Sequence, residues 1–131
     1  MKGRKTSKGR ETILLVEDDR SLVYLTKSLL EERGYKVLLA WDGEEALDIY
    51  REHKNEIAVI ITDMGLPKLG GWEVFKSIKE IDPKAKVILV SGYVDQKLKA
   101  EMMSAGAADF VQKPYDPYQI AKKIRRMIDA R

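Results

Sequence analysis

Apolar residues in this chain gather in five short runs. The runs cover residues 12–16, 36–41, 57–61, 86–90 and 109–112. The central run, 57–61, is rich in β-branched residues and shows no alternation of apolar and polar positions, which is typical of a parallel strand buried on both faces. We therefore predict that these runs are the strands of one sheet.

The segments between the runs have the spacing and capping signals of helices. The predicted helices cover residues 21–33, a segment opening at residue 42, a segment opening near residue 72, residues 95–105, and a last segment after residue 116. Leu22, Leu25 and Leu29 share helical spacing in the first, with Asp19 or Ser21 as the N-cap. Strictly alternating strands and helices predict an α/β fold of the (βα)5 type. In this fold a five-stranded parallel sheet is joined by right-handed crossovers and is doubly wound, with helices on both faces.

Composition and charge divide the chain into a short tail and a domain. The 131 residues suit one domain, no apolar run is long enough for a membrane span, and the absence of cysteine fits a cytoplasmic protein. Five bases and no acid lie in residues 1–10, so the net charge of +3 leaves −2 for the rest. We predict a disordered basic tail or linker at 1–10 and a domain at 11–131. The tail lacks aromatic residues for stacking on bases, so we expect no nucleic-acid partner, and no membrane partner.

Candidate functional side chains follow four of the five runs. Glu17 and Asp18 follow the first, Asp63 the third, Ser91 the fourth and Lys113 the fifth. If the strand order is 2-1-3-4-5, these groups meet at the carboxyl edge of the sheet, where open α/β sheets bind ligands. Three carboxylates in one crevice repel each other unless a cation is present, and oxygen ligands favour Mg²⁺. With no cysteine and one histidine, a zinc site is disfavoured.

The ordered combination of these motifs resembles the receiver domain of bacterial response regulators. The matching residues are Glu17-Asp18, Asp63 with Pro67 and Gly71, Ser91-Gly92 and Lys113-Pro114. The resemblance covers residues 11–131. It implies a flavodoxin-like sheet with strand order 2-1-3-4-5.

The resemblance also implies an aspartyl-phosphate switch. Asp63 would be the nucleophile and phosphoacceptor, and the donor a phosphohistidine on a sensor histidine kinase or a histidine phosphotransfer protein. Asp18 and Asp63 would ligate Mg²⁺, with Glu17 acting through water and the main-chain carbonyl of Gly65 as a further ligand. Mg²⁺ and Lys113 would neutralise charge on the transferring phosphoryl group.

The same resemblance implies a conformational change after phosphorylation. Ser91 would bond the phosphoryl group, and Phe110 would follow Ser91 inward. The changed face would be the helix at 95–105, the strand at 109–112 and the last helix, where a downstream protein or a second copy would dock.

Such a domain catalyses its own phosphorylation and dephosphorylation but has no separate turnover module, so enzyme status stays open. Because nothing after the last helix forms an output module, we expect a stand-alone receiver or one excised from a longer protein.

Each residue also has a simpler interpretation. The alternatives are that Asp63 caps a helix and that Lys113 is a surface lysine. Ser91 could be an ordinary strand-end hydroxyl, and Phe110 could pack in the core. Three departures from the family pattern matter. Glu17 replaces the aspartate often found first in the acid pair, and Phe110 lacks the hydroxyl of a tyrosine. Gly65 offers no side chain beside the phosphoryl group.

Other function classes fit less well. A haloacid-dehalogenase-like hydrolase needs a second acid where this chain has Gly65, and a dinucleotide site would not place acids after the first strand. The main alternative is a receiver-fold adaptor that binds partners without phosphorylation.

Overall fold

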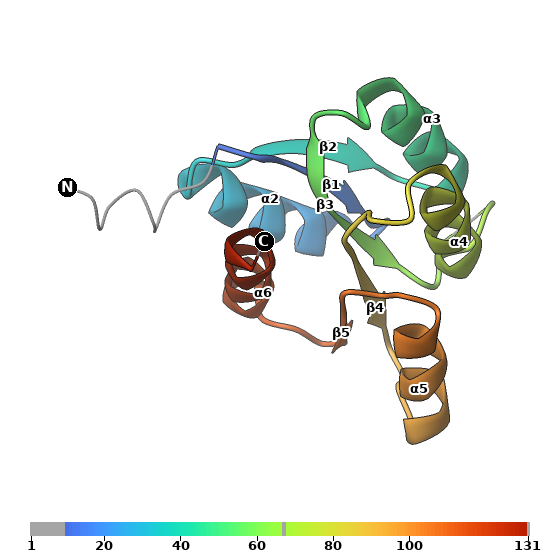
Figure 1. Cartoon of the computed structure of the whole chain (residues 1–131). Helices are drawn as coiled ribbons and strands as arrows, with labels where there is room; N and C mark the ends of the chain where they lie inside the picture. Colours follow the sequence, from blue (N-terminus) through green and yellow to red (C-terminus); the bar gives the residue numbers. More distant parts are fainter. Residues whose placement is uncertain (1–9, 67, 131) are drawn as a thin grey trace.

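The computed structural model describes residues 10–66 and 68–130 and has the predicted α/β architecture (Figure 1). The five parallel strands are ordered β2-β1-β3-β4-β5. The strands are β1 (Thr12–Val16), β2 (Lys36–Ala40), β3 (Ile57–Asp63), β4 (Val87–Ser91) and β5 (Asp109–Gln112). The helices are α2 (Arg20–Glu32), α3 (Gly43–His53), α4 (Gly71–Ile81), α5 (Gln96–Ser104) and α6 (Pro117–Asp129). The predicted strand order is therefore confirmed.

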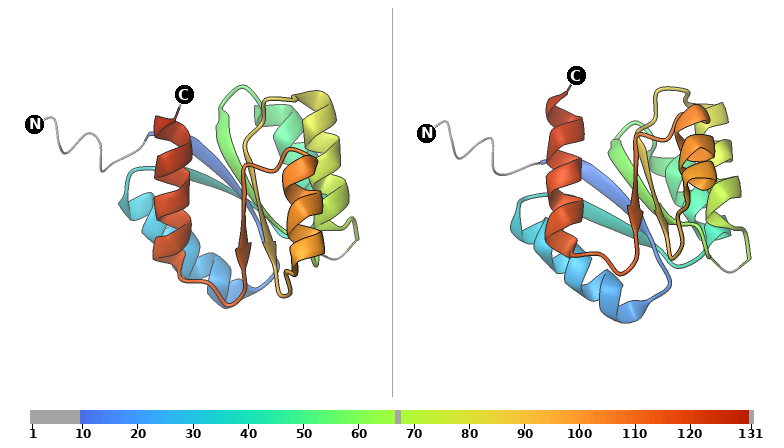
Figure 2. Two further views of the ribbon diagram at one scale, coloured as in Figure 1. Left: turned by 60° about the horizontal axis from the view of Figure 1, so that its bottom comes forward. Right: turned by 90° about the horizontal axis from the view of Figure 1, so that it is seen from below.

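Two hydrophobic layers hold the sheet between the helices. Figure 2 shows α2 and α6 on one face of the sheet and α3, α4 and α5 on the other. Along β1, Ile13 and Leu15 pack toward α2 and α6, whereas Leu14 and Val16 pack on the opposite side. All four are at most 1% exposed, and burying such a side chain contributes about 1.5–3 kcal/mol. The unbroken apolar pattern of β1 thus reflects burial on both faces.

The first helix corrects one detail of the sequence prediction. Asp19 is the N-cap, because its Oδ1 accepts a hydrogen bond from Leu22 N at 3.2 Å. Leu25, although it shares helical spacing with Leu29, is 55% exposed. The buried face is instead centred on Thr26 and Leu30, both 0% exposed, so the helix is rotated relative to the predicted stripe.

Some predicted features lie outside the described residues. These are Pro67 and residues 1–9, which make up all but Arg10 of the predicted basic tail. Across residues 10–66 and 68–130, no helix is long and apolar enough to cross a membrane.

Candidate functional site

The carboxyl ends of β1 and β3 bring three acids together. Carboxylate oxygens of Glu17, Asp18 and Asp63 all lie within 4.8 Å of one another. Glu17 is 2% exposed and Asp63 6% exposed, whereas Asp18 is exposed. The buried pair follows from strand register, since parallel neighbours end at the same edge of the sheet. The cluster therefore has two buried oxygen donors and one that faces solvent.

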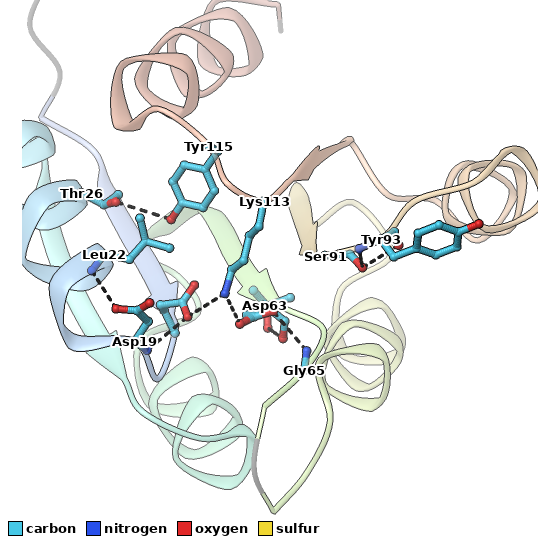
Figure 3. A network of polar contacts seen from close by, with 11 residues as sticks. Asp19, Leu22, Thr26, Asp63, Gly65, Ser91, Tyr93, Lys113 and Tyr115 are labelled. Carbon is cyan, nitrogen blue, oxygen red and sulfur yellow. Dashed lines mark hydrogen bonds and ion pairs between the residues drawn. The ribbon is translucent and has the colours of Figure 1, made fainter.

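Lys113 reaches this cluster from the end of β5. Its Nζ donates to Asp63 Oδ2 at 2.7 Å and to Glu17 Oε2 at 3.1 Å, and Figure 3 shows the side chain pointing toward Asp63. Burial of the ammonium works to lower the pKa of Lys113, but the hydrogen bonds to Asp63 and Glu17 outweigh it and raise that pKa above its usual value. Lys113 thus remains a cation that neutralises the buried acids.

The surroundings of Glu17 raise the pKa of its carboxyl group. Burial, followed by the negative charge of Asp63, raises the pKa of Glu17 to about 7, and the bond from Lys113 opposes the rise. Glu17 Oε2 also accepts a hydrogen bond from Asp19 N at 3.2 Å. Burial and repulsion by Asp63 therefore outweigh the stabilisation that Lys113 gives to the Glu17 carboxylate.

The backbone after β3 shapes the other side of Asp63. Gly65 N donates to Asp63 Oδ1 at 3.1 Å, so each Asp63 oxygen has a donor. Among the described residues, the atom nearest to a Cβ added at Gly65 would be Asp63 Oδ1, at 3.9 Å. These residues leave the space beside the carboxylate open on this side, as expected where residue 65 has no side chain.

Ser91 lies at the end of β4, but its hydroxyl is not directed at the acids. Ser91 Oγ donates to Tyr93 O at 2.9 Å and accepts from Tyr93 N at 3.3 Å. Figure 3 shows Ser91 beside Tyr93 and turned from Asp63. Lys113 N donates to Ser91 O at 2.8 Å, so the backbone of Ser91 is tied to the site while its side chain is engaged locally.

Phe110 belongs to the core in this structure. It is partly buried and packs against the hydrophobic layer on the α3, α4 and α5 side of the sheet. Lys99 Nζ lies 5.5 Å from the centre of its ring, a cation–π contact between α5 and β5. The core-packing interpretation of Phe110 thus describes its present contacts.

Tyr115 is a neighbour of the site that the sequence analysis did not identify as functional. Its hydroxyl lies 3.5 Å from Thr26 Oγ1, and burial raises the pKa of Tyr115 to about 12 (Figure 3). Tyr115 thereby joins the segment after Lys113 to α2. The one available signal was Thr26, a polar residue between apolar residues on the buried face of a helix.

The chemistry of the donors fits Mg²⁺. Carboxylate oxygens are its preferred ligands, and a site that keeps one side open to water suits a cation that retains part of its hydration shell. A divalent ion would also balance the charge that Lys113 leaves unpaired.

Comparison with known proteins gives one consistent family. The family model of the response regulator receiver domain matches residues 13–125. The chemotaxis protein CheY of Thermotoga maritima is 32% identical over 116 residues, which is 88% of this chain and 95% of that protein. Some relatives are much longer: the chain spans 48% of one transcriptional regulatory protein and 13% of one sensor kinase.

Solved structures agree with this relationship. A receiver domain protein from Clostridium thermocellum superposes with a TM-score of 0.84 at 34% identity, covering 91% of this chain and 94% of that one. A CheX–CheY–BeF3–Mg²⁺ complex from Borrelia burgdorferi contains a chain with a TM-score of 0.84 and 27% identity, covering 90% of this chain and 89% of that one.

Proposed function

Because this chain belongs to the response regulator receiver family, we propose that it is a phosphoacceptor domain of a two-component phosphorelay. Asp63 takes the phosphoryl group from a phosphohistidine on a sensor histidine kinase or a histidine phosphotransfer protein. The observation that carries the proposal is the position of Asp63: a buried carboxylate 2.7 Å from Lys113 Nζ and clustered with two further acids.

In the proposed reaction, a carboxylate oxygen of Asp63 attacks phosphorus. The O–P bond forms as the N–P bond of the phosphohistidine breaks, and the electron pair returns to the imidazole nitrogen. Lys113, already bonded to Asp63, follows the developing charge onto the phosphoryl oxygens. The amide of Gly65 holds the other carboxylate oxygen and so fixes the orientation of the group.

Asp18, Asp63 and Glu17 would hold Mg²⁺, with the carbonyl of Gly65 as an added ligand. When bound, the ion would supply positive charge to the transferring phosphoryl group, and most catalysis of phosphoryl transfer lies in such charge neutralisation. The relative solved with BeF3 and Mg²⁺ supports this part of the proposal.

The proposed switch requires Ser91 to change partners. Its hydroxyl now bonds the backbone of Tyr93, so bonding a phosphoryl oxygen means leaving that turn. Release of this turn would alter the contacts of Phe110 and Lys99, and with them the face of α5, β5 and α6. A downstream protein or a second copy of the chain would read the change there.

Incubation with Mg²⁺ and acetyl phosphate tests the proposal. Intact mass should increase by one phosphoryl group in the wild type and not in Asp63→Asn, and the gain should disappear when EDTA removes the metal. Equal modification of wild type and Asp63→Asn would refute the assignment of the nucleophile. If neither protein is modified by acetyl phosphate or by a phosphohistidine donor, the adaptor function without phosphorylation would replace this proposal.

A further inference from the structure

Residues 64–66 and 68–70, called here the β3–α4 loop, follow Asp63, and the second of these segments is in close contact with the start of α3. Gly43 is the first residue of α3, and a Cβ placed on it would overlap Leu69 O and lie 2.6 Å from Leu69 Cβ. Real Cβ atoms essentially never come within 3.0 Å of such neighbours. The two backbones can touch here only because residue 43 has no side chain.

An ion pair joins the same two segments. Lys68 Nζ lies 3.5 Å from Asp42 Oδ2, and Asp42 directly precedes Gly43. Asp42 also caps α3, since its Oδ1 accepts from Glu45 N at 2.9 Å; this bond, aided by Lys68, lowers the pKa of the Asp42 carboxyl. Lys68 has a φ of 65°, a left-handed conformation that is uncommon outside glycine. The loop therefore holds a strained shape where it meets α3.

Neither side of this contact has room to yield. Gly71, at the other end of the loop, lies so close to β3 that a Cβ on it would overlap Asp63 O and lie 2.6 Å from Met64 Cα. Helix α3 is fixed in the core through Ala46 and Tyr50, which are 0% and 2% exposed. Gly71 N also donates to Met64 O at 3.3 Å, so a displacement of Leu69 would pass through Gly70 and Gly71 to Met64, the neighbour of Asp63.

Gly65 is where such a displacement would reach the acidic cluster. Its N–H donates to Asp63 Oδ1 at 3.1 Å, and it lies between Asp63 and the segment that touches α3. Gly43 itself lies on a different element, outside the acidic cluster. An influence of residue 43 on the cluster would therefore run through Leu69 and the loop.

We propose that Gly43 is a positioning residue for the acidic site. The missing side chain lets Leu69 lie against α3, and this contact keeps the loop in the shape that orients Gly65 and the Asp63 carboxylate. Its effect on phosphoryl transfer rests on the proposed function, whereas its effect on the Gly65 amide can be measured in the metal-free protein.

The test compares Gly43→Ala with the wild type. We expect the amide resonance of Gly65 to shift and its hydrogen exchange to accelerate in the metal-free variant. Phosphorylation by acetyl phosphate should slow roughly ten- to a hundredfold, because small misplacements of reacting groups reduce rates by such factors. If residue 43 served only α3, alanine would leave stability unchanged or raise it, since it restricts the unfolded chain more than glycine does.

Val37→Ala is the matched control for a general loss of stability. Val37 is 8% exposed and packs in the layer between the sheet and α2 and α6, away from the β3–α4 loop. It should lower the melting temperature while the Gly65 amide and the phosphorylation rate stay as in the wild type. If Gly43→Ala also leaves both readouts unchanged, the positioning role is refuted.

A second pair of variants keeps the test decisive if Gly43→Ala does not fold. Asp42→Asn keeps an N-cap residue but removes the charge that pairs with Lys68, and Lys68→Met removes the other partner. Each should shift the Gly65 amide, and the double variant should shift it no further. An unchanged Gly65 amide in both would overturn the inference. If the amide shifts as expected while wild type accepts no phosphoryl group, the positioning role stands and the proposed function fails.

Discussion

Replacing Lys113 by methionine should destabilise the metal-free protein more than the loss of an ordinary ion pair. Lys113 bonds two carboxylate side chains that are only 2% and 8% exposed, at 3.1 and 2.7 Å. Removing one partner of a buried pair costs about 3–5 kcal/mol because a buried charge is left uncompensated. Since 26% of the Lys113 side chain is exposed, water would partly solvate the carboxylates left unpaired. We therefore expect the free energy of unfolding to fall by about 2–4 kcal/mol at pH 8.

The loss of unfolding free energy caused by Lys113→Met should grow as the pH rises. In the wild type Glu17 has a pKa of about 7, raised from 4.5, so between these values the folded state binds a proton that the unfolded state lacks. Stability in the absence of metal therefore falls as the pH rises from 4.5 through 7. Lys113 lowers the pKa of Glu17, so Lys113→Met should raise that pKa further. The stability of the variant should then continue to fall above pH 7. The difference between variant and wild type should increase by about 1 kcal/mol from pH 5.5 to pH 8.

Urea denaturation in EDTA at pH 5.5 and pH 8 measures both effects. Lys123→Met is the control. Lys123 Nζ lies 2.8 Å from Asp109 Oδ2, with side chains 19% and 25% exposed, and within residues 10–66 and 68–130 it pairs with that one carboxylate. We expect its loss to be at most about 1 kcal/mol and similar at both pH values. Equal losses of unfolding free energy in the two variants would refute the conclusion that Lys113 neutralises the buried carboxylates. A loss in Lys113→Met that does not grow with pH would refute it too.

Three further outcomes are expected. Asp18→Ala should abolish Mg²⁺ binding in calorimetry, because Asp18 is the solvent-facing acid of the cluster; unchanged binding would remove it from the site. Gly71→Ala should destabilise the fold by several times the effect of Gly92→Ala in thermal denaturation. A Cβ at Gly71 would overlap Asp63 O, whereas one at Gly92 would have no atom of the described residues within 4 Å. Adding beryllofluoride with Mg²⁺ should change amide exchange in residues 92–115, and silence there would refute the proposed switch face.

The sequence predicted that Glu17, Asp18 and Asp63 lie close together, because their placement at strand ends follows from local patterns. The apolar run before Asp63 and the acids after the first run lie at strand ends, and parallel strands deliver their ends to one edge. The strand order itself came from the family resemblance and is confirmed. Lys113 followed from the same reasoning, and the structure places its ammonium between Glu17 and Asp63.

Contacts that depend on rotamers or on distant loops could not be predicted. The hydroxyl of Ser91 is engaged by the turn at Tyr93, an alternative that strand register does not reveal. Leu25 has helical spacing but is exposed, because the packing of α2 against α6 sets the rotation of the helix. The contact of Gly43 with Leu69 joins residues far apart in the chain, and a glycine at the start of a helix has no sequence signal for such a partner.

The central claim is that Asp63 carries the phosphoryl group, and locating the modified residue tests it most directly. After incubation with Mg²⁺ and acetyl phosphate, reduction with borohydride converts an aspartyl phosphate to homoserine, which tandem mass spectrometry locates in the chain. We predict homoserine at position 63 in the wild type and at no position when Mg²⁺ is withheld. Homoserine at position 18, or modification of Ser91 with position 63 intact, would contradict the account.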